Sequence, residues 1–245
     1  MKTPTIDHKF IKEWEPKYDI LACDYVDYSN ILQQVQHELT QHGNISRETA
    51  QTIVRWKAGR AFEKVKWHLY NVRYAPRFSL ALSDSIGDHN KLRILVWNRT
   101  KLETLPYRSE TFDSIIGDSH GIGTPIASAF LHFMFPDRFP IIDVRVSEVL
   151  YLCGITKSIE TNERAYDKFH PLMLEMAKRL SCSLRTIDKA LFAYHEGYLQ
   201  PQINAKFVEM ASKRQYSTAA VGEGLPLDAD KKFRKMIIDM LKLDP

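Results

Sequence analysis

The sequence contains few cysteines and no long apolar run. The three cysteines, Cys23, Cys153 and Cys182, are odd in number and widely spaced. Such scattered thiols argue against a disulfide framework and are typical of a reducing compartment. No stretch approaches the roughly 18 apolar residues needed to span a bilayer, and the first residues contain no apolar signal core. We therefore expect a cytoplasmic protein with no membrane partner.

Helical signals dominate what is present. The composition, 44% hydrophobic and 26% charged, is that of a globular chain. Ser29 and Ser46 are placed to cap helices that run to about residues 42 and 69. Further helices are expected over residues 111–118, 124–135, 144–153, 162–180, 184–195 and 229–243, and residues 92–97 fit either a short strand or a buried helix end. No repeat or linker divides the chain, so a single all-α domain over residues 1–245 is predicted.

Positive charge is concentrated in one segment, from Arg55 to Arg77. The whole chain carries a net charge of +4. This segment alone contains one acidic residue, Glu63, and seven basic residues: Arg55, Lys57, Arg60, Lys64, Lys66, Arg73 and Arg77. Aromatic residues lie between them: Trp56, Phe62, Trp67, Tyr70 and Tyr74. Cations that contact phosphates and rings that stack on bases suit a polyanion-binding surface. A solvated helix face with its aromatic rings in the core is the alternative that the same pattern allows.

A glycine turn precedes the helix expected from residue 124. The run from His120 to Thr124 reads H-G-I-G-T, and Pro125 follows it. Glycine tolerates a tight turn, and proline suits the first turn of a helix, where its missing N–H has no helical partner. The free N–H groups at such a helix start can hold a phosphate.

A second motif lies one helix downstream. Residues 139–143 read F-P-I-I-D, and Asp143 is placed to cap the next helix. Val146, Val149 and Leu150 fall on the buried face of that helix, and Gly154 is placed to end it.

Between residues 115 and 154 the sequence resembles the helix-hairpin-helix DNA glycosylases, the superfamily of the endonuclease-III-type and adenine-mismatch enzymes. The G-I-G turn corresponds to the hairpin of that family, and F-P-I-I-D followed by Val146, Val149 and Leu150 corresponds to its catalytic aspartate run, at the family spacing from position 125. The resemblance implies two helical lobes flanking a DNA-binding cleft, with residues 111–154 as the core motif. It also implies a monomer that binds double-stranded DNA and flips a base, with Asp143 as the catalytic residue.

The resemblance also implies roles for other residues. In the family the hairpin binds the DNA backbone and holds a monovalent cation through main-chain carbonyls, which here implies K⁺ or Na⁺ at Gly121 and Gly123. The implied DNA contacts are His120, Gly121, Ile122, Gly123, Thr124 and Arg145, and the basic segment adds Arg55, Lys57 and Arg60. Candidates for the base pocket or wedge are Trp56, Trp67, Tyr70 and Tyr194, although large aromatic residues more often lie in a core.

Three departures from the family pattern refine the expected reaction. His120 replaces the hairpin proline, and the family's four-cysteine iron–sulfur loop is absent, since only three cysteines exist. Pro125 occupies the position of the lysine that forms a Schiff base in bifunctional members. The expected enzyme is therefore monofunctional, needs no cofactor, and leaves an abasic site after water attacks the sugar.

Alternatives remain open at this point. One is a non-catalytic DNA-binding protein in which Asp143 only caps a helix, and another is a glycosylase-lyase that uses Lys57 or the N-terminal amine. The substrate base is open as well. A damaged or mismatched base would mean repair, in a bacterium at the nucleoid, whereas a modified phage base would mean antiviral defence.

Overall fold

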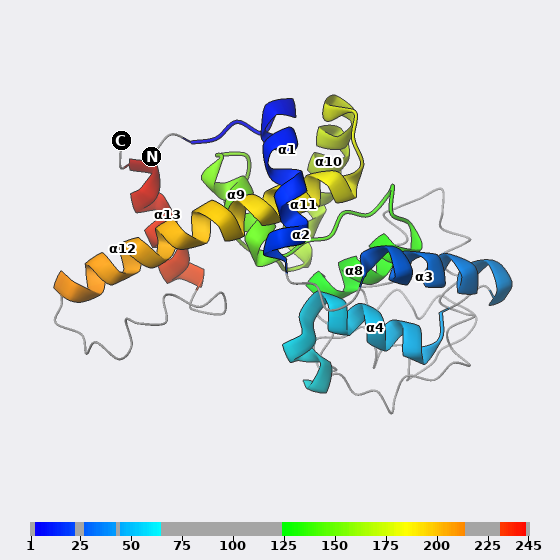
Figure 1. The fold of residues 1–245 in the computed structure, drawn as a ribbon. Helices are drawn as coiled ribbons and strands as arrows, with labels where there is room; N and C mark the ends of the chain where they lie inside the picture. Colours follow the sequence, from blue (N-terminus) through cyan, green and yellow to red (C-terminus); the bar gives the residue numbers. More distant parts are fainter. Residues whose placement is uncertain (1–2, 23–26, 43–44, 65–123, 214–230, 244–245) are drawn as a thin grey trace. The chain divides into compact units, whose positions relative to one another are not determined.

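The structure is a computed structural model that describes residues 3–22, 27–42, 45–64, 124–213 and 231–243. Every regular element in these ranges is a helix, which confirms the all-α prediction for the described part of the chain (Figure 1). The strand or helix end expected over residues 92–97, and the helix expected over 111–118, lie outside these ranges. The chain divides into two compact units, one formed by residues 1–23 and 142–245, the other by residues 24–141.

The unit of residues 24–141 is built around one apolar helix. α8 (Thr124–Met134) is buried along nearly its whole length and contacts α3 (Tyr28–His42) and α4 (Arg47–Ala58), after which a 3₁₀ helix covers Gly59–Lys64. A helix that is apolar on every side needs cover on every side. The cover comes from fully buried side chains of its neighbours, which include Ile31, Val35, Ile53 and Val54.

Two predicted N-terminal caps, Ser29 and Ser46, belong to helices of this unit. Ser46 accepts a hydrogen bond from the backbone N–H of Thr49, so its predicted cap is confirmed. The prediction for Ser29 is wrong, because α3 already contains Ser29 and the Asp27 carboxylate accepts its backbone N–H at 2.8 Å. Asp27 caps α3 in place of Ser29, since aspartate and serine are both good N-terminal caps.

The unit of residues 1–23 and 142–245 contains the remaining helices. Its short N-terminal helices are α1 (His8–Trp14) and α2 (Tyr18–Leu21), and its longer ones are α9 (Val144–Leu152), α10 (Glu163–Leu180), α11 (Leu184–Tyr194), α12 (Gln200–Lys213) and α13 (Lys231–Leu243). α11 lies at its centre, in contact with α1, α2, α9 and α10, while α13 packs on α9 and α12. The sequence analysis did not anticipate α1, α2 or α12.

α11 and α12 follow each other as one long rod, because a π-helix over His195–Leu199 joins them without a break (Figure 1). The backbone N–H of Gln200 bonds to the carbonyl of His195, five residues back. Such wide turns are rare and occur frequently at functional sites.

The two ends of α9 follow the sequence prediction. The Asp143 carboxylate accepts the backbone N–H of Val146 at 3.0 Å. At the other end Gly154 takes a φ of +71°, and its N–H bonds to the carbonyl of Tyr151. Both predictions, a start at Asp143 and a stop at Gly154, are confirmed. The helix that carries the candidate catalytic aspartate therefore has well-defined ends.

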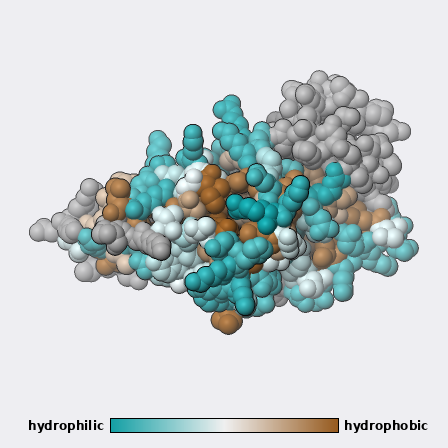
Figure 2. All heavy atoms as spheres, turned by 90° about the horizontal axis from the view of Figure 1, so that it is seen from above, coloured by the Kyte–Doolittle hydropathy of each residue, from teal (hydrophilic) through white to brown (hydrophobic). Residues whose placement is uncertain are grey.

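Hydrophilic side chains cover much of the described surface, with smaller apolar areas between them (Figure 2). Among the described helices, none combines the length and the apolar character needed to cross a membrane.

Two glycines form a matched pair for testing the stop of α9. Gly154 adopts a left-handed conformation, whereas Gly59 follows α4 with a helical φ of −48°, and an added Cβ would meet open space at both positions. Gly154→Ala should lower the free energy of unfolding by about 1–2 kcal/mol, because a Cβ disfavours that conformation. Gly59→Ala should raise it by about 0.4–1 kcal/mol. Urea unfolding measures both, and shifts of the same sign would contradict this account.

Candidate functional site

The F-P-I-I-D run is anchored on its N-terminal side by a buried histidine. Phe139 is 1% exposed, and its carbonyl lies 2.8 Å from Nδ1 of His132. A carbonyl only accepts, so Nδ1 carries a hydrogen and donates it. In the neutral ring Nε2 then accepts from the hydroxyl of Tyr28, which lies 2.8 Å away. α3 and α8 thereby hold the backbone from which the run to Asp143 begins.

Asp143 lies half-buried at the positive end of α9. The free N–H groups of a helix N-terminus favour a negative charge at this place. One carboxylate oxygen is engaged by Val146, which fixes the orientation of the side chain. A fixed carboxylate at a helix start can act as a cap, and it can also stabilise a positive charge that develops on a bound substrate.

Arg145 projects from the first turn of α9, two residues after Asp143. Its Nε donates to Glu196 at 2.5 Å, and its guanidinium carbon lies 4.7 Å from the centre of the Phe192 ring. The hydrogen bond leaves the two terminal nitrogens unused, and these nitrogens have no hydrogen-bond partner within the described part of the chain. The side chain is 28% exposed, so it is held in place at one nitrogen and still reaches solvent.

A second ion pair in the same unit is fully buried. Glu148, on α9, and Arg234, on α13, both have 0% exposure. Arg234 Nε donates to one carboxylate oxygen at 2.6 Å and one of its terminal nitrogens donates to the other at 2.7 Å. The same terminal nitrogen donates to the side chain of Gln200, on α12, at 2.8 Å. Two parallel bonds between a guanidinium and a carboxylate are among the strongest hydrogen-bonded pairs in proteins.

His195 connects the two ion pairs. Its Nε2 lies 2.9 Å from Glu148 and its Nδ1 lies 3.1 Å from Glu196. Ionised carboxylates only accept hydrogen bonds, so both contacts are hydrogen bonds together when the ring carries a hydrogen on each nitrogen. A continuous chain of hydrogen-bonded ionisable groups therefore runs from Arg234 through Glu148, His195 and Glu196 to Arg145. We call this chain the buried charge network.

The network keeps its carboxylates ionised. Burial disfavours the charge of Glu148, but the hydrogen bonds and charges of Arg234 and His195 outweigh burial and lower its pKa. Burial also disfavours the charge of Glu196, but the hydrogen bonds and charges of His195 and Arg145 outweigh burial and lower the pKa of this carboxyl. Both acids are thus negatively charged near neutral pH.

The hairpin and part of the basic segment lie outside the part of the chain that the structure describes. His120, Gly121, Ile122, Gly123, Trp67 and Tyr70 lie outside the described residues, as does the side chain of Arg60. Thr124 is the first residue of α8 and is 8% exposed. Arg55 is exposed and lies over the Phe62 ring at 4.0 Å, and Lys57 is partly exposed.

Two aromatic candidates for the base pocket lie in packed surroundings. Trp56 contacts the rings of Tyr28 and Phe133, and it packs against the core of its unit. Tyr194 is 5% exposed and packs on Phe10 and Trp14, in the other unit. Burial raises the pKa of its hydroxyl. These contacts support a structural role for both rings.

The sequence analysis missed Glu148, His195 and Arg234. A signal for Glu148 existed, because its side of the predicted helix, opposite Val146 and Leu150, also carries the apolar residues Val144, Tyr151 and Leu152 at spacings of three and four. A charge in that position requires a buried partner. Sequence alone does not identify the partner, since Arg234 lies 86 positions away.

Removing the charge of Glu148 tests the network. Glu148→Gln leaves Arg234 and His195 without their buried carboxylate, and we expect a loss of about 3–5 kcal/mol in the free energy of unfolding. The matched control is Glu160→Gln, which breaks an exposed pair with Lys231 at 3.1 Å and should cost less than about 1 kcal/mol. Equal losses in the two variants would contradict a special role for the buried pair.

The same comparison has a predicted pH dependence. The pKa of Glu148 is lowered from its ordinary value of 4.5, so its contribution is complete above that pH and disappears as the pH falls through the lowered value. The stability difference between the parent and Glu148→Gln should therefore shrink below pH 4.5. Chemical denaturation across the acid range measures this difference.

No known protein family, curated protein or solved structure matches the chain. The functional argument therefore depends on the motifs in the sequence and on the contacts of Asp143, Arg145 and the buried charge network.

Proposed function

We propose that the chain is a monofunctional DNA glycosylase with a helix-hairpin-helix fold, which hydrolyses the N-glycosidic bond of a flipped base. The observation that carries this proposal is the position of Asp143: it ends the F-P-I-I-D run, begins α9, and is held by one backbone N–H. The motif provides the resemblance, and the structure supports it with a carboxylate in a defined orientation.

Asp143 would act on the sugar. Cleavage of the glycosidic bond develops positive charge on the sugar ring, as in other glycoside hydrolyses. A fixed carboxylate stabilises that charge, and it can also accept a proton from the attacking water. The oxygen of water bonds to the sugar carbon, the base leaves with the bond electrons and takes up a proton, and the DNA strand stays intact.

Arg145 would contact a DNA phosphate near the reacting sugar. Its terminal nitrogens are available, while Glu196 and Phe192 restrict where the side chain can go. Guanidinium groups bind phosphate oxygens through charge-assisted hydrogen bonds. In this proposal Glu196 is a positioning residue, because it acts on DNA only through Arg145.

Pro125 supports the monofunctional form of the reaction. It lies in the first turn of α8, at the position where the bifunctional relatives carry a lysine, and its ring offers no free amine. No Schiff base can form there, so water is the final nucleophile.

A screen of DNA substrates would identify the excised base and, with it, the biological role. Base release from damaged DNA would indicate repair, and release from phage DNA that carries a modified base would indicate defence. Mass spectrometry of the released bases distinguishes these sources.

Substituting Asp143 tests the catalytic assignment. Asp143→Asn should lower single-turnover base release at least about 100-fold, because an amide still caps the helix but carries no charge. Folding and DNA affinity should stay near those of the parent. Asp137→Asn, an exposed aspartate six positions earlier, is the matched control and should be fully active.

The product of the same assay separates the competing functions. DNA treated with the parent protein should stay unbroken until hot alkali cleaves it at abasic sites. Strand cleavage without alkali would indicate a glycosylase-lyase instead. DNA binding with no base release from any substrate would indicate a non-catalytic DNA-binding protein.

Substituting Glu196 tests its positioning role. Glu196→Gln removes a negative charge, so DNA binding should not weaken, but Arg145 loses its charge-assisted hydrogen bond and kcat should fall about tenfold. Glu209→Gln, which removes the charge of an exposed carboxylate paired with Lys206 at 3.2 Å, is the control and should leave kcat unchanged. A drop in kcat with KM unchanged or lower supports the role, and unchanged kcat contradicts it.

A further inference from the structure

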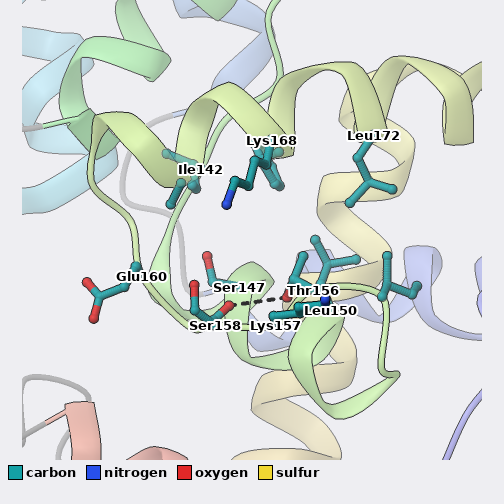
Figure 3. A pocket seen from close by; sticks show the side chains of 12 residues that line it. Ile142, Ser147, Leu150, Thr156, Lys157, Ser158, Glu160, Lys168 and Leu172 are labelled. Atoms are coloured by element: carbon teal, nitrogen blue, oxygen red, sulfur yellow. Dashed lines mark hydrogen bonds between the residues drawn. The ribbon is translucent and has the colours of Figure 1, made fainter.

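A cavity of about 380 Å³ opens between α9, the segment after it, and the first half of α10 (Figure 3). All of its lining residues belong to the unit that contains Asp143. Ile142, which directly precedes Asp143, and Ser147, one helical turn after it, both line the cavity. Its volume lies within the usual range of about 300–1,000 Å³ for small-molecule sites.

The cavity has an apolar base. Ile142 and Leu150 are fully buried, and Phe169 is 3% exposed. Surfaces of this kind bind the apolar or planar part of a ligand, which gains by leaving water.

Its lining carries two lysines and one acid. Lys157 and Lys168 line the cavity, and neither pairs with a carboxylate in the described part of the chain. The single lining acid, Glu160, is already paired with Lys231 at 3.1 Å. In Figure 3 the Lys168 side chain extends from α10 toward Ser147 and Ser158, whereas the Glu160 carboxylate points away at the edge.

Ser147 adds a buried polar group. It is 4% exposed, and its hydroxyl oxygen points into the cavity on the side of Lys168 (Figure 3). Within the described ranges this hydroxyl forms no hydrogen bond, whereas the buried hydroxyl of Ser128 donates to the Pro125 carbonyl at 2.8 Å. A hydroxyl that has no hydrogen bond within the protein and faces an open cavity is a group that a ligand can engage.

We propose that this cavity binds the phosphoryl group of an organic phosphate. Lys157 and Lys168 supply the charge, the hydroxyls of Ser147 and Ser158 donate to phosphate oxygens, and the apolar body of the ligand packs on Leu150 and Phe169. Lysine is a common phosphate ligand that acts as a point charge, and hydrogen bonds to ionised oxygens are about twice as strong as neutral ones. A nucleoside monophosphate has this combination of groups, and so does a nucleotide within a DNA strand.

Direct binding measurements test the proposal without any measurement of base excision. Calorimetry on the full chain would use adenosine monophosphate, inorganic phosphate and adenosine. We expect adenosine monophosphate to bind most tightly and adenosine, which lacks the phosphoryl group, to bind at least about tenfold more weakly. Equal affinity for adenosine and its monophosphate would overturn the proposal.

Variants locate the binding at this cavity. Lys168→Ala and Ser147→Ala should each weaken the binding of adenosine monophosphate, and Lys168→Arg should largely restore it. Lys178→Ala is the matched control, because Lys178 is an exposed lysine on the same helix and does not line the cavity. Thermal unfolding establishes that each variant is folded.

The same variants, titrated with a DNA duplex, identify the source of the phosphate. Loss of nucleotide binding with unchanged duplex affinity assigns a free ligand, and loss of duplex affinity assigns a strand phosphate. If Lys168→Ala and Ser147→Ala change neither affinity, the proposal is overturned. Because Asp143 is intact in all of these variants, this outcome is independent of whether the protein excises bases.

Discussion

The carboxylate of Glu148, sealed from water, determines how its unit must pack. An ion without a partner in such a place would cost several kcal/mol. Arg234 of α13 supplies the counter-charge, His195 of the π-helix bonds to the same carboxylate, and Gln200 of α12 bonds to the Arg234 guanidinium. α13 and the rod that contains the π-helix are therefore tied to α9, the helix that begins at Asp143. The arrangement also explains why Arg145 can be held in place although it reaches solvent, since Glu196 is itself held by His195.

Local signals predicted three helix ends well. The start of α9 at Asp143, its stop at Gly154 and the start of α4 at Ser46 each depend on one residue and its near neighbours. The start of α3 was placed wrongly because Asp27 and Ser29 are both capping residues, and their order of preference depends on context. α12 was not expected, since it has no separate start: the rod of α11 continues into it through the π-helix.

Long-range partners could not be predicted in the same way. A charge on an apolar helix face indicates that a buried partner exists, but it does not say whether that partner is Arg234 or another cation. The pairing of His195 with two carboxylates has the same difficulty, because His195 and Glu148 come together only when the helices pack. Aromatic residues are ambiguous for a related reason. A tryptophan such as Trp56 suits a base pocket and a core equally well until its neighbours are known.

The π-helix has a consequence for changes in chain length. An ordinary helix turns by about 100° per residue, so one extra residue within a turn rotates everything after it by that amount. The wide turn at His195–Leu199 absorbs such an extra residue, and α12 thereby presents Gln200 to Arg234. Gly197 lies within this turn, where a Cβ would come within 3.0 Å of the Trp14 ring. A single-residue deletion there would restore an ordinary helical turn, and α12 would keep the face that presents Gln200 to Arg234. The wide turn thus acts as an insertion that the fold has incorporated into its geometry.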